Sequence, residues 1–167
     1  MTPTVGNRRD GPAVAATLKQ ILLAPERREA VVEDLQVLVD NEVASKSGMS
    51  GFAVKGSFAV VKKFKSGFIP HAIDQMLPEF AQKLQPYYAR YDPARDGSLA
   101  NFLVANSSPV ADILLGVADS RARKAGHETV KKAYQKLRPQ AKKHVEHALP
   151  ALGDLIERHA KAVDAPA

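Results

Sequence analysis

Apolar residues recur with the period of an α-helix through most of this chain, and no segment alternates apolar and polar residues as a half-buried strand would. Eleven prolines interrupt the helical pattern. Because a proline bends a helix interior but is harmless in the first helical turn, we interpret most of them as helix starts or kinks. The sequence therefore predicts an all-α fold, a compact bundle of short, proline-punctuated helices, rather than one long coiled coil.

The helical pattern also predicts where individual helices begin and end. Apolar residues between Val31 and Val43 form one stripe, and we expect Gly48 to end that helix. Ser50 is a suitable N-cap for a following helix that reaches Phe64.

The second half of the chain continues in the same way. After a helix that contains Ile73 to Tyr88, residues 92–97 are expected to form a loop and residues 99–105 a short helix. A further helix is expected to open at Ser108, followed by one or two helices that Pro139 and Pro150 interrupt. We expect one domain over residues 13–163, with flexible tails at 1–12 and 164–167.

Composition excludes several classes of function. The chain has no cysteine, which excludes a disulfide framework, a thiolate nucleophile and a zinc site with cysteine ligands. No run approaches the roughly 18 apolar residues that a membrane-spanning helix needs. We therefore expect a cytoplasmic protein, or one that lies at a membrane surface.

Charge is distributed in blocks along the chain. Residues 26–42 carry six acids against two arginines, residues 46–70 carry five lysines and no acid, and residues 121–143 carry nine bases against Glu128 alone. Such blocks either attract anionic partners or pair with one another inside the molecule.

The acid-free block at residues 46–70 also contains four of the six phenylalanines. On a helical wheel Val54, Phe58 and Val61 share an apolar arc with Val60, whereas the lysines lie on the other side. This pattern is typical either of an ordinary bundle helix or of a helix that meets an anionic membrane or an acidic protein. The lysines that would make such a contact are Lys55, Lys62, Lys63 and Lys65, and pairing with Glu33, Asp34 or Asp40 would instead neutralise them internally.

Two other interpretations compete with this one. The basic residues could bind nucleic acid without sequence preference, although no nucleic-acid-binding motif is present. Alternatively, a bundle of kinked helices could enclose a pocket for a small apolar ligand. The residues expected to line that pocket are Met76, Phe80, Tyr87 and Tyr88, which would otherwise belong to a solid core.

Catalytic and metal-binding patterns are incomplete. Gly51 and Gly56 have the spacing of a phosphate-binding loop, but the lysine that must follow is replaced by Ser57. His144 and His147 share a helical face without a carboxylate at the spacing of a known helical metal site. We therefore expect a binding protein without catalytic machinery, cofactor or metal.

Six segments of the chain form a recognisable succession: residues 18–25 (LKQILLAP), 31–35 (VVEDL), 42–48 (EVASKSG), 53–55 (AVK), 132–134 (KAY) and 155–160 (LIERHA). In these segments the chain resembles a known family of small actinobacterial proteins, a domain of unknown function. The resemblance covers about residues 17–161 and implies a cytoplasmic helical domain, without supplying an activity, cofactor or site.

Overall fold

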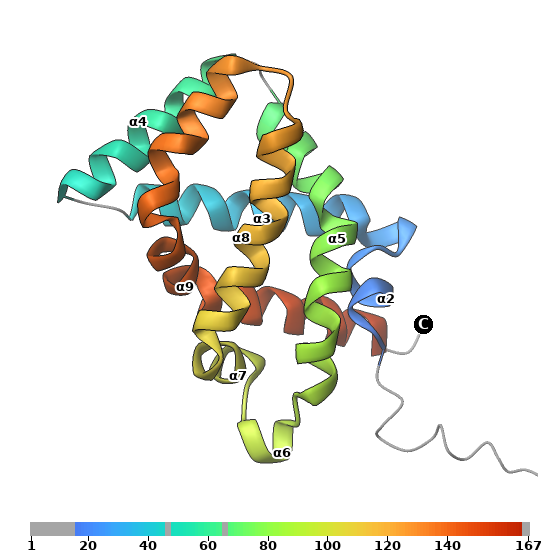
Figure 1. Cartoon of the computed structure of the whole chain (residues 1–167). Coiled ribbons are helices and arrows are strands. Elements are labelled where there is room, and N and C mark those ends of the chain that lie inside the picture. Colours follow the sequence, from blue (N-terminus) through green and yellow to red (C-terminus); the bar gives the residue numbers. More distant parts are fainter. Residues whose placement is uncertain (1–15, 46–47, 65–66, 165–167) are drawn as a thin grey trace, which may run out of the picture.

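The computed structural model of the chain describes residues 16–45, 48–64 and 67–164. This part contains eight helices and no strand, so the predicted all-α bundle is confirmed (Figure 1). The predicted tail at residues 1–12 lies outside the described residues, and the last helix extends to Asp164.

The first two helices begin with local sequence signals. α2 (Leu18–Leu22) starts with a capping box, in which the side chains of Thr17 and Gln20 each accept a hydrogen bond from the other residue's backbone N–H. α3 (Pro25–Ala44) starts at a proline, whose missing N–H is harmless in the first turn.

α3 ends at Ala44 with Ser45 as its C-cap, and not at Gly48 as the sequence suggested. The N–H of Ser45 donates to the Asn41 carbonyl, and its hydroxyl donates to the Glu42 carbonyl at 2.8 Å. Since these bonds already satisfy carbonyls of the last turn, no glycine is needed there. Gly48 is instead the first residue of α4 (Gly48–Phe64), so the prediction of Ser50 as its N-cap was also wrong.

The middle of the chain forms one long and three shorter helices. α5 (Phe68–Arg90) follows Gly67, whose φ of +79° is a conformation that glycine adopts readily, and contains Pro78 and Pro86 inside it. α7 (Leu99–Ala105) has the predicted bounds, and α8 (Ser107–Lys124) begins one residue earlier than expected.

The predicted loop at residues 92–97 contains a helical turn, α6 (Pro93–Asp96). Asp92 caps it by accepting a hydrogen bond from the Ala94 N–H at 3.0 Å, and Pro93 occupies the first helical position. The expectation of an irregular loop was therefore wrong for these four residues.

α9 (Glu128–Asp164) is a single helix of 37 residues that contains both Pro139 and Pro150. It changes direction along its length, as expected for a helix with internal prolines (Figure 1). Its first part lies beside α4, and its last part runs back toward α2, so α9 contacts both ends of the bundle.

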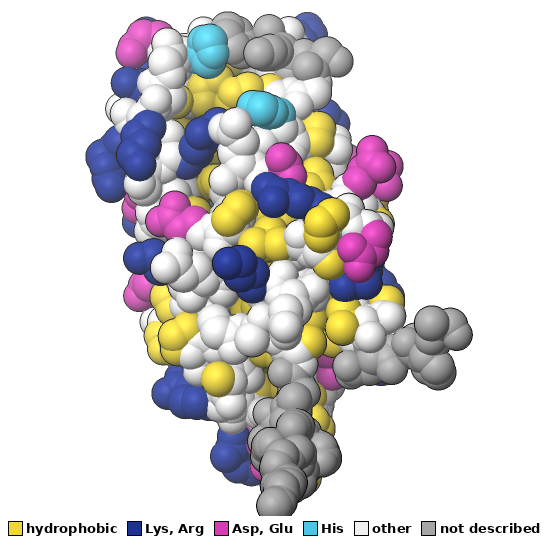
Figure 2. All heavy atoms as spheres, turned by 90° about the vertical axis from the view of Figure 1, so that its right-hand side faces the viewer, with side chains coloured by type: hydrophobic (Ala, Val, Ile, Leu, Met, Phe, Trp, Pro, Cys, Tyr) yellow, Lys and Arg dark blue, Asp and Glu magenta, His cyan; other side chains and the backbone are white. Residues whose placement is uncertain are grey.

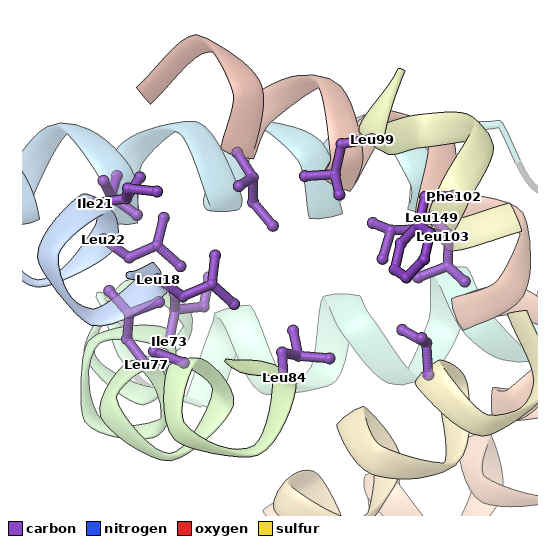
Figure 3. Close-up of a cluster of buried hydrophobic side chains, with 14 of the residues drawn as sticks. Leu18, Ile21, Leu22, Ile73, Leu77, Leu84, Leu99, Phe102, Leu103 and Leu149 are labelled. Atoms are coloured by element: carbon purple, nitrogen blue, oxygen red, sulfur yellow. The ribbon is translucent and has the colours of Figure 1, made fainter. Parts of the chain in front are cut away.

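The core is built from leucines and other apolar residues of α2, α3, α5, α7, α8 and α9. Figure 3 shows Leu18 of α2 close to Ile73 and Leu77 of α5, whereas Phe102 and Leu103 of α7 meet Leu149 of α9. α7 and α9 approach so closely that a Cβ added to Gly153 would lie 2.6 Å from the Ala100 backbone.

Within the described residues, no single helix has the length and apolar character to cross a membrane; α7 and α8 would meet that test only together, and they are bent by 90°.

Candidate functional site

An apolar cavity of about 270 Å³ lies between α2, α3, α5, α8 and α9. Its wall carries almost no polar surface. The lining residues are Leu22, Leu35, Leu38, Val39, Ile73, Met76, Leu77, Phe80, Leu84, Leu114, Leu115, Ala118, Val145, Ala148, Leu149, Leu152, Leu155 and Ile156. Because Leu77 and Leu149 are fully buried whereas Leu38 and Phe80 are half-buried, the cavity extends from the core toward the surface.

Two of the four residues predicted to line an apolar pocket belong to this wall. Met76 and Phe80 face the cavity from α5. Tyr87 and Tyr88 pack against the core elsewhere: Tyr87 lies beneath the Arg90 guanidinium at 4.3 Å, and Tyr88 faces Tyr91 with ring centroids 6.4 Å apart. The helical period alone could not separate these positions, since all four lie on the inner side of α5.

Two histidine–carboxylate hydrogen bonds join α3 to α9 beside the cavity. The buried His159 contacts Asp34 at 2.8 Å, and His147 contacts Glu42 at 2.8 Å. Asp34 and Glu42 lie on either side of the α3 residues that line the cavity. No cluster of three or more potential metal ligands occurs in the part of the chain that the structure describes.

The lysines predicted to contact a partner differ in whether they are paired with an acid. Lys55 and Lys63 are exposed on α4. Lys62 pairs with Asp40 at 3.5 Å and lies over the Phe58 ring at 5.3 Å. Lys65 lies outside the described residues. The acidic helix therefore neutralises one of these lysines, and that pair is exposed.

α4 and the first part of α9 lie side by side at the edge of the molecule (Figure 1). A groove of about 550 Å³ lies between them. It brings together the two basic blocks of the sequence. Its lining residues are Gly56, Ser57 and Val60 of α4 with Thr129, Lys132, Ala133 and Lys136 of α9. Val60 was expected on the apolar inner arc of its helix, but it is 46% exposed in this groove, while Val54 and Val61 are buried as expected.

The same part of α9 is tied to α8 by a polar network around Asp119. The Tyr134 hydroxyl donates to Asp119 Oδ1, and Arg138 donates to both of its carboxylate oxygens at 2.8 and 3.0 Å. The hydrogen bond from Arg138, together with that from Tyr134, holds the pKa of Asp119 below its ordinary value. Burial, and secondly the bond to Asp119, raises the pKa of Tyr134.

Charges of both signs are mixed on the face of the molecule that Figure 2 shows. On the face shown in Figure 2, Lys and Arg side chains are intermixed with Asp and Glu, and apolar side chains lie between them. No block of one sign dominates this face, in contrast to the lysines at the groove.

These features define an all-α protein with an apolar cavity in its bundle and a basic groove at its edge. Residues 18–160 match the model of a family of unknown function, DUF6918, and the chain belongs to that family. The resemblance expected over residues 17–161 is thereby confirmed, while the match carries no information on the source organism. Searches of curated proteins and of solved structures each found no significant match.

Proposed function

We propose that this protein is a non-enzymatic binding protein that holds a small apolar molecule in the cavity between α2, α3, α5, α8 and α9. The observation that carries this proposal is the composition of the wall, which consists of aliphatic side chains, Met76 and Phe80. Ligand pockets are mostly apolar concavities between packed elements, and helical bundles form them between their helices.

The wall also limits the chemistry of the ligand. A charged or strongly polar group inside this cavity would lose its hydration without gaining a hydrogen bond. The volume of 270 Å³ equals that of about nine water molecules at ~30 Å³ each. The ligand is therefore an uncharged hydrocarbon-like molecule of the size of a bicyclic aromatic compound or a medium-length alkyl chain.

Binding of the uncharged fluorophore N-phenyl-1-naphthylamine tests this proposal. Its fluorescence should rise on addition of the protein, and an Ala148→Leu variant, which extends a side chain into the cavity, should bind at least about ten-fold more weakly. Ala151→Leu is the matched control, because Ala151 lies one turn further along α9 and is exposed.

Two results would overturn the proposal: no fluorescence increase with the parent protein, or equal affinity for the parent and Ala148→Leu. An Ala118→Val variant provides a second cavity-lining change on another helix, in case the larger side chain at residue 148 disturbs folding.

A second candidate function is contact with an anionic membrane or an acidic protein through α4. It is supported by Lys55 and Lys63, which are exposed and have no acidic partner within the described residues. Co-sedimentation with phosphatidylglycerol-containing vesicles should fall in a Lys55→Glu/Lys63→Glu variant. It should be retained in Lys19→Glu/Lys83→Glu, which makes the same change of charge on α2 and α5.

A further inference from the structure

The groove between α4 and α9 combines an apolar surface with hydrogen-bond donors. Gly56 and Ala133 are small, and Val60 is 46% exposed, so the groove offers apolar contact area. Two hydroxyl groups, Ser57 and Thr129, and two ammonium groups, Lys132 and Lys136, belong to the same lining. All four polar groups can donate hydrogen bonds.

Ser57 is the most informative of these residues. It is only 5% exposed, and its hydroxyl makes no hydrogen bond within the part of the chain that the structure describes. A buried hydroxyl without a partner is destabilising, and native proteins contain few of them. Because Ser57 lines the groove, a ligand placed there can accept its hydrogen bond.

The two groove lysines differ from their neighbours on α9. Arg138 is paired with Asp119, and Lys142 contacts both Ser108 and Asp112. Lys132 and Lys136 are exposed and have no acidic partner among the described residues. Since residues four apart lie on the same face of a helix, their ammonium groups can converge on one anion.

Lys63 of α4 continues this positive surface. It follows Val60 by three residues and Gly56 by seven, so it lies on the groove face of its helix. Lys55 lies on another side of α4, and Lys62 is held by Asp40. Of the three described lysines predicted to meet a partner, Lys63 is thus the one placed beside the groove.

We propose that the α4–α9 groove binds a phosphate monoester with a small apolar substituent. Lys132, Lys136 and the Ser57 hydroxyl donate to the phosphate oxygens, and the substituent lies on Val60 and Ala133. A phosphate supplies several acceptor oxygens to match these donors, and the apolar surface favours an organic ester over inorganic phosphate. The proposal goes beyond both candidate functions, because the groove is a separate site lined by other residues.

Calorimetric titration with phenyl phosphate tests the site, with inorganic phosphate and phenol as partial ligands. Phenyl phosphate should bind more tightly than either partial ligand, and its affinity should fall with rising salt. Lys132→Gln/Lys136→Gln should weaken binding at least about ten-fold, because it removes two charge-assisted hydrogen bonds. The control Lys19→Gln/Lys83→Gln removes the same charge elsewhere and should bind like the parent.

Ser57→Ala separates a ligand-binding role from a structural one. It should weaken binding of phenyl phosphate by about ten-fold, while the unliganded protein stays equally stable or becomes more stable, since a buried unpaired hydroxyl is removed. A structural role would instead lower the stability of the unliganded protein and leave the affinity unchanged. Ala148→Leu should retain full binding, which excludes the core cavity as the location.

Three results would overturn the proposal: no binding of phenyl phosphate by the parent protein, equal affinity in the parent and Lys132→Gln/Lys136→Gln, or inorganic phosphate binding as tightly as the ester. If vesicles are bound through Lys55 and Lys63 while phenyl phosphate is not bound, the groove proposal fails and the second candidate function stands. Conversely, if phenyl phosphate is bound while vesicles are not, the groove proposal stands and the second candidate function fails.

Discussion

The two halves of α9 belong to one helix but are attached to the molecule by different interactions. Residues 128–143 are joined to α8 by polar contacts, from Tyr134 and Arg138 to Asp119 and from Lys142 to Asp112. Residues 145–163 are attached mainly by apolar packing, in which Leu149, Leu155 and Ile156 are at most 3% exposed.

The two candidate sites follow this division. The cavity adjoins the apolar half of α9, whereas the groove adjoins the polar half. Apolar packing fixes shape at every pH, but contacts between charged groups depend on protonation and salt. Substitutions in the apolar half should therefore have larger effects on stability, and those in the polar half should have effects that depend on pH.

The largest effect is expected at the crossing of α7 and α9. Gly153→Ala places a Cβ 2.6 Å from the Ala100 Cα and N atoms, which are backbone and cannot rotate away. The helices must separate, and we expect the free energy of unfolding, measured in urea, to fall by about 3 kcal/mol.

Gly116→Ala is the control for this change. Gly116 lies inside α8 with open space around its Cα, so the substitution should gain up to ~1 kcal/mol from helix propensity. If Gly153→Ala were as stable as the parent, α9 and α7 would not be in backbone contact, and the contrast between the halves of α9 would lose its main support.

The next largest effect is expected at the hydrogen bond that joins the buried His159 of α9 to Asp34 of α3. Asp34→Ala leaves the His159 imidazole, which is 8% exposed, without its carboxylate partner, and should lower the unfolding free energy by about 2 kcal/mol. Asp40→Ala is the matched control, because it also removes an aspartate carboxylate from α3. The ion pair that it breaks, with Lys62, is exposed. The substitution should change stability by less than ~0.5 kcal/mol. Equal losses in the two variants would show that the burial of His159 does not strengthen its hydrogen bond to Asp34.

The sequence predicted the helices better than it predicted their ends and continuity. α7 has the predicted bounds because Ser98 caps it and its residues Leu99, Phe102 and Leu103 are buried. The continuity of α9 was left open, since a proline removes one hydrogen bond and neighbouring helices decide whether the bent helix persists. Gly48 was misplaced because hydrogen bonds from Ser45 already end α3.

The sequence predicted the candidate sites less well than it predicted the helices. Met76 and Phe80 were expected to line a pocket, but a helical stripe does not distinguish a cavity wall from a filled core, since both are apolar. Ser57 appeared in the sequence only as a residue that breaks a phosphate-loop motif. Its burial beside Lys132 and Lys136 depends on how α4 packs against α9, two helices that are far apart in the sequence.

The polar half of α9 should respond to acid. The pKa of Asp119 is lowered in the folded protein by Arg138 and Tyr134, so its contribution is present above the ordinary pKa of about 4 and is lost as pH falls through the folded value. Asp119→Asn should cost roughly 1–2 kcal/mol at pH 7, because it weakens charge-assisted bonds.

Urea unfolding of the parent and Asp119→Asn between pH 7 and pH 3 measures the contribution of the Asp119 charge to stability. The difference in stability should shrink below about pH 4. As the pH is lowered, residue-resolved hydrogen exchange should show that residues 128–143 open before residues 145–163. A difference that stays constant with pH would show that Asp119 acts through packing and not through its charge.

The smallest effect is expected at Tyr91, which makes a polar contact with the apolar half of α9. Its hydroxyl donates to the Gly97 carbonyl at 2.6 Å and lies 3.2 Å from the Glu157 carboxylate of α9. Burial, and secondly the charge of Glu157, raises the pKa of Tyr91 to about 12.

The folded protein holds the Tyr91 proton more tightly than the unfolded chain does, in which the pKa has its ordinary value of about 10. The contribution of the Tyr91 hydroxyl to stability is therefore complete below pH ~10 and is lost as pH rises toward ~12. Tyr91→Phe should therefore be less stable than the parent by about 1 kcal/mol at pH 8, and the two should converge over that alkaline range. Tyrosinate absorbance should show one fewer group titrating near pH 12 in the variant. A pH-independent stability difference would mean that Tyr91 acts through the packing of its ring against Phe102 of α7 and not through its hydroxyl.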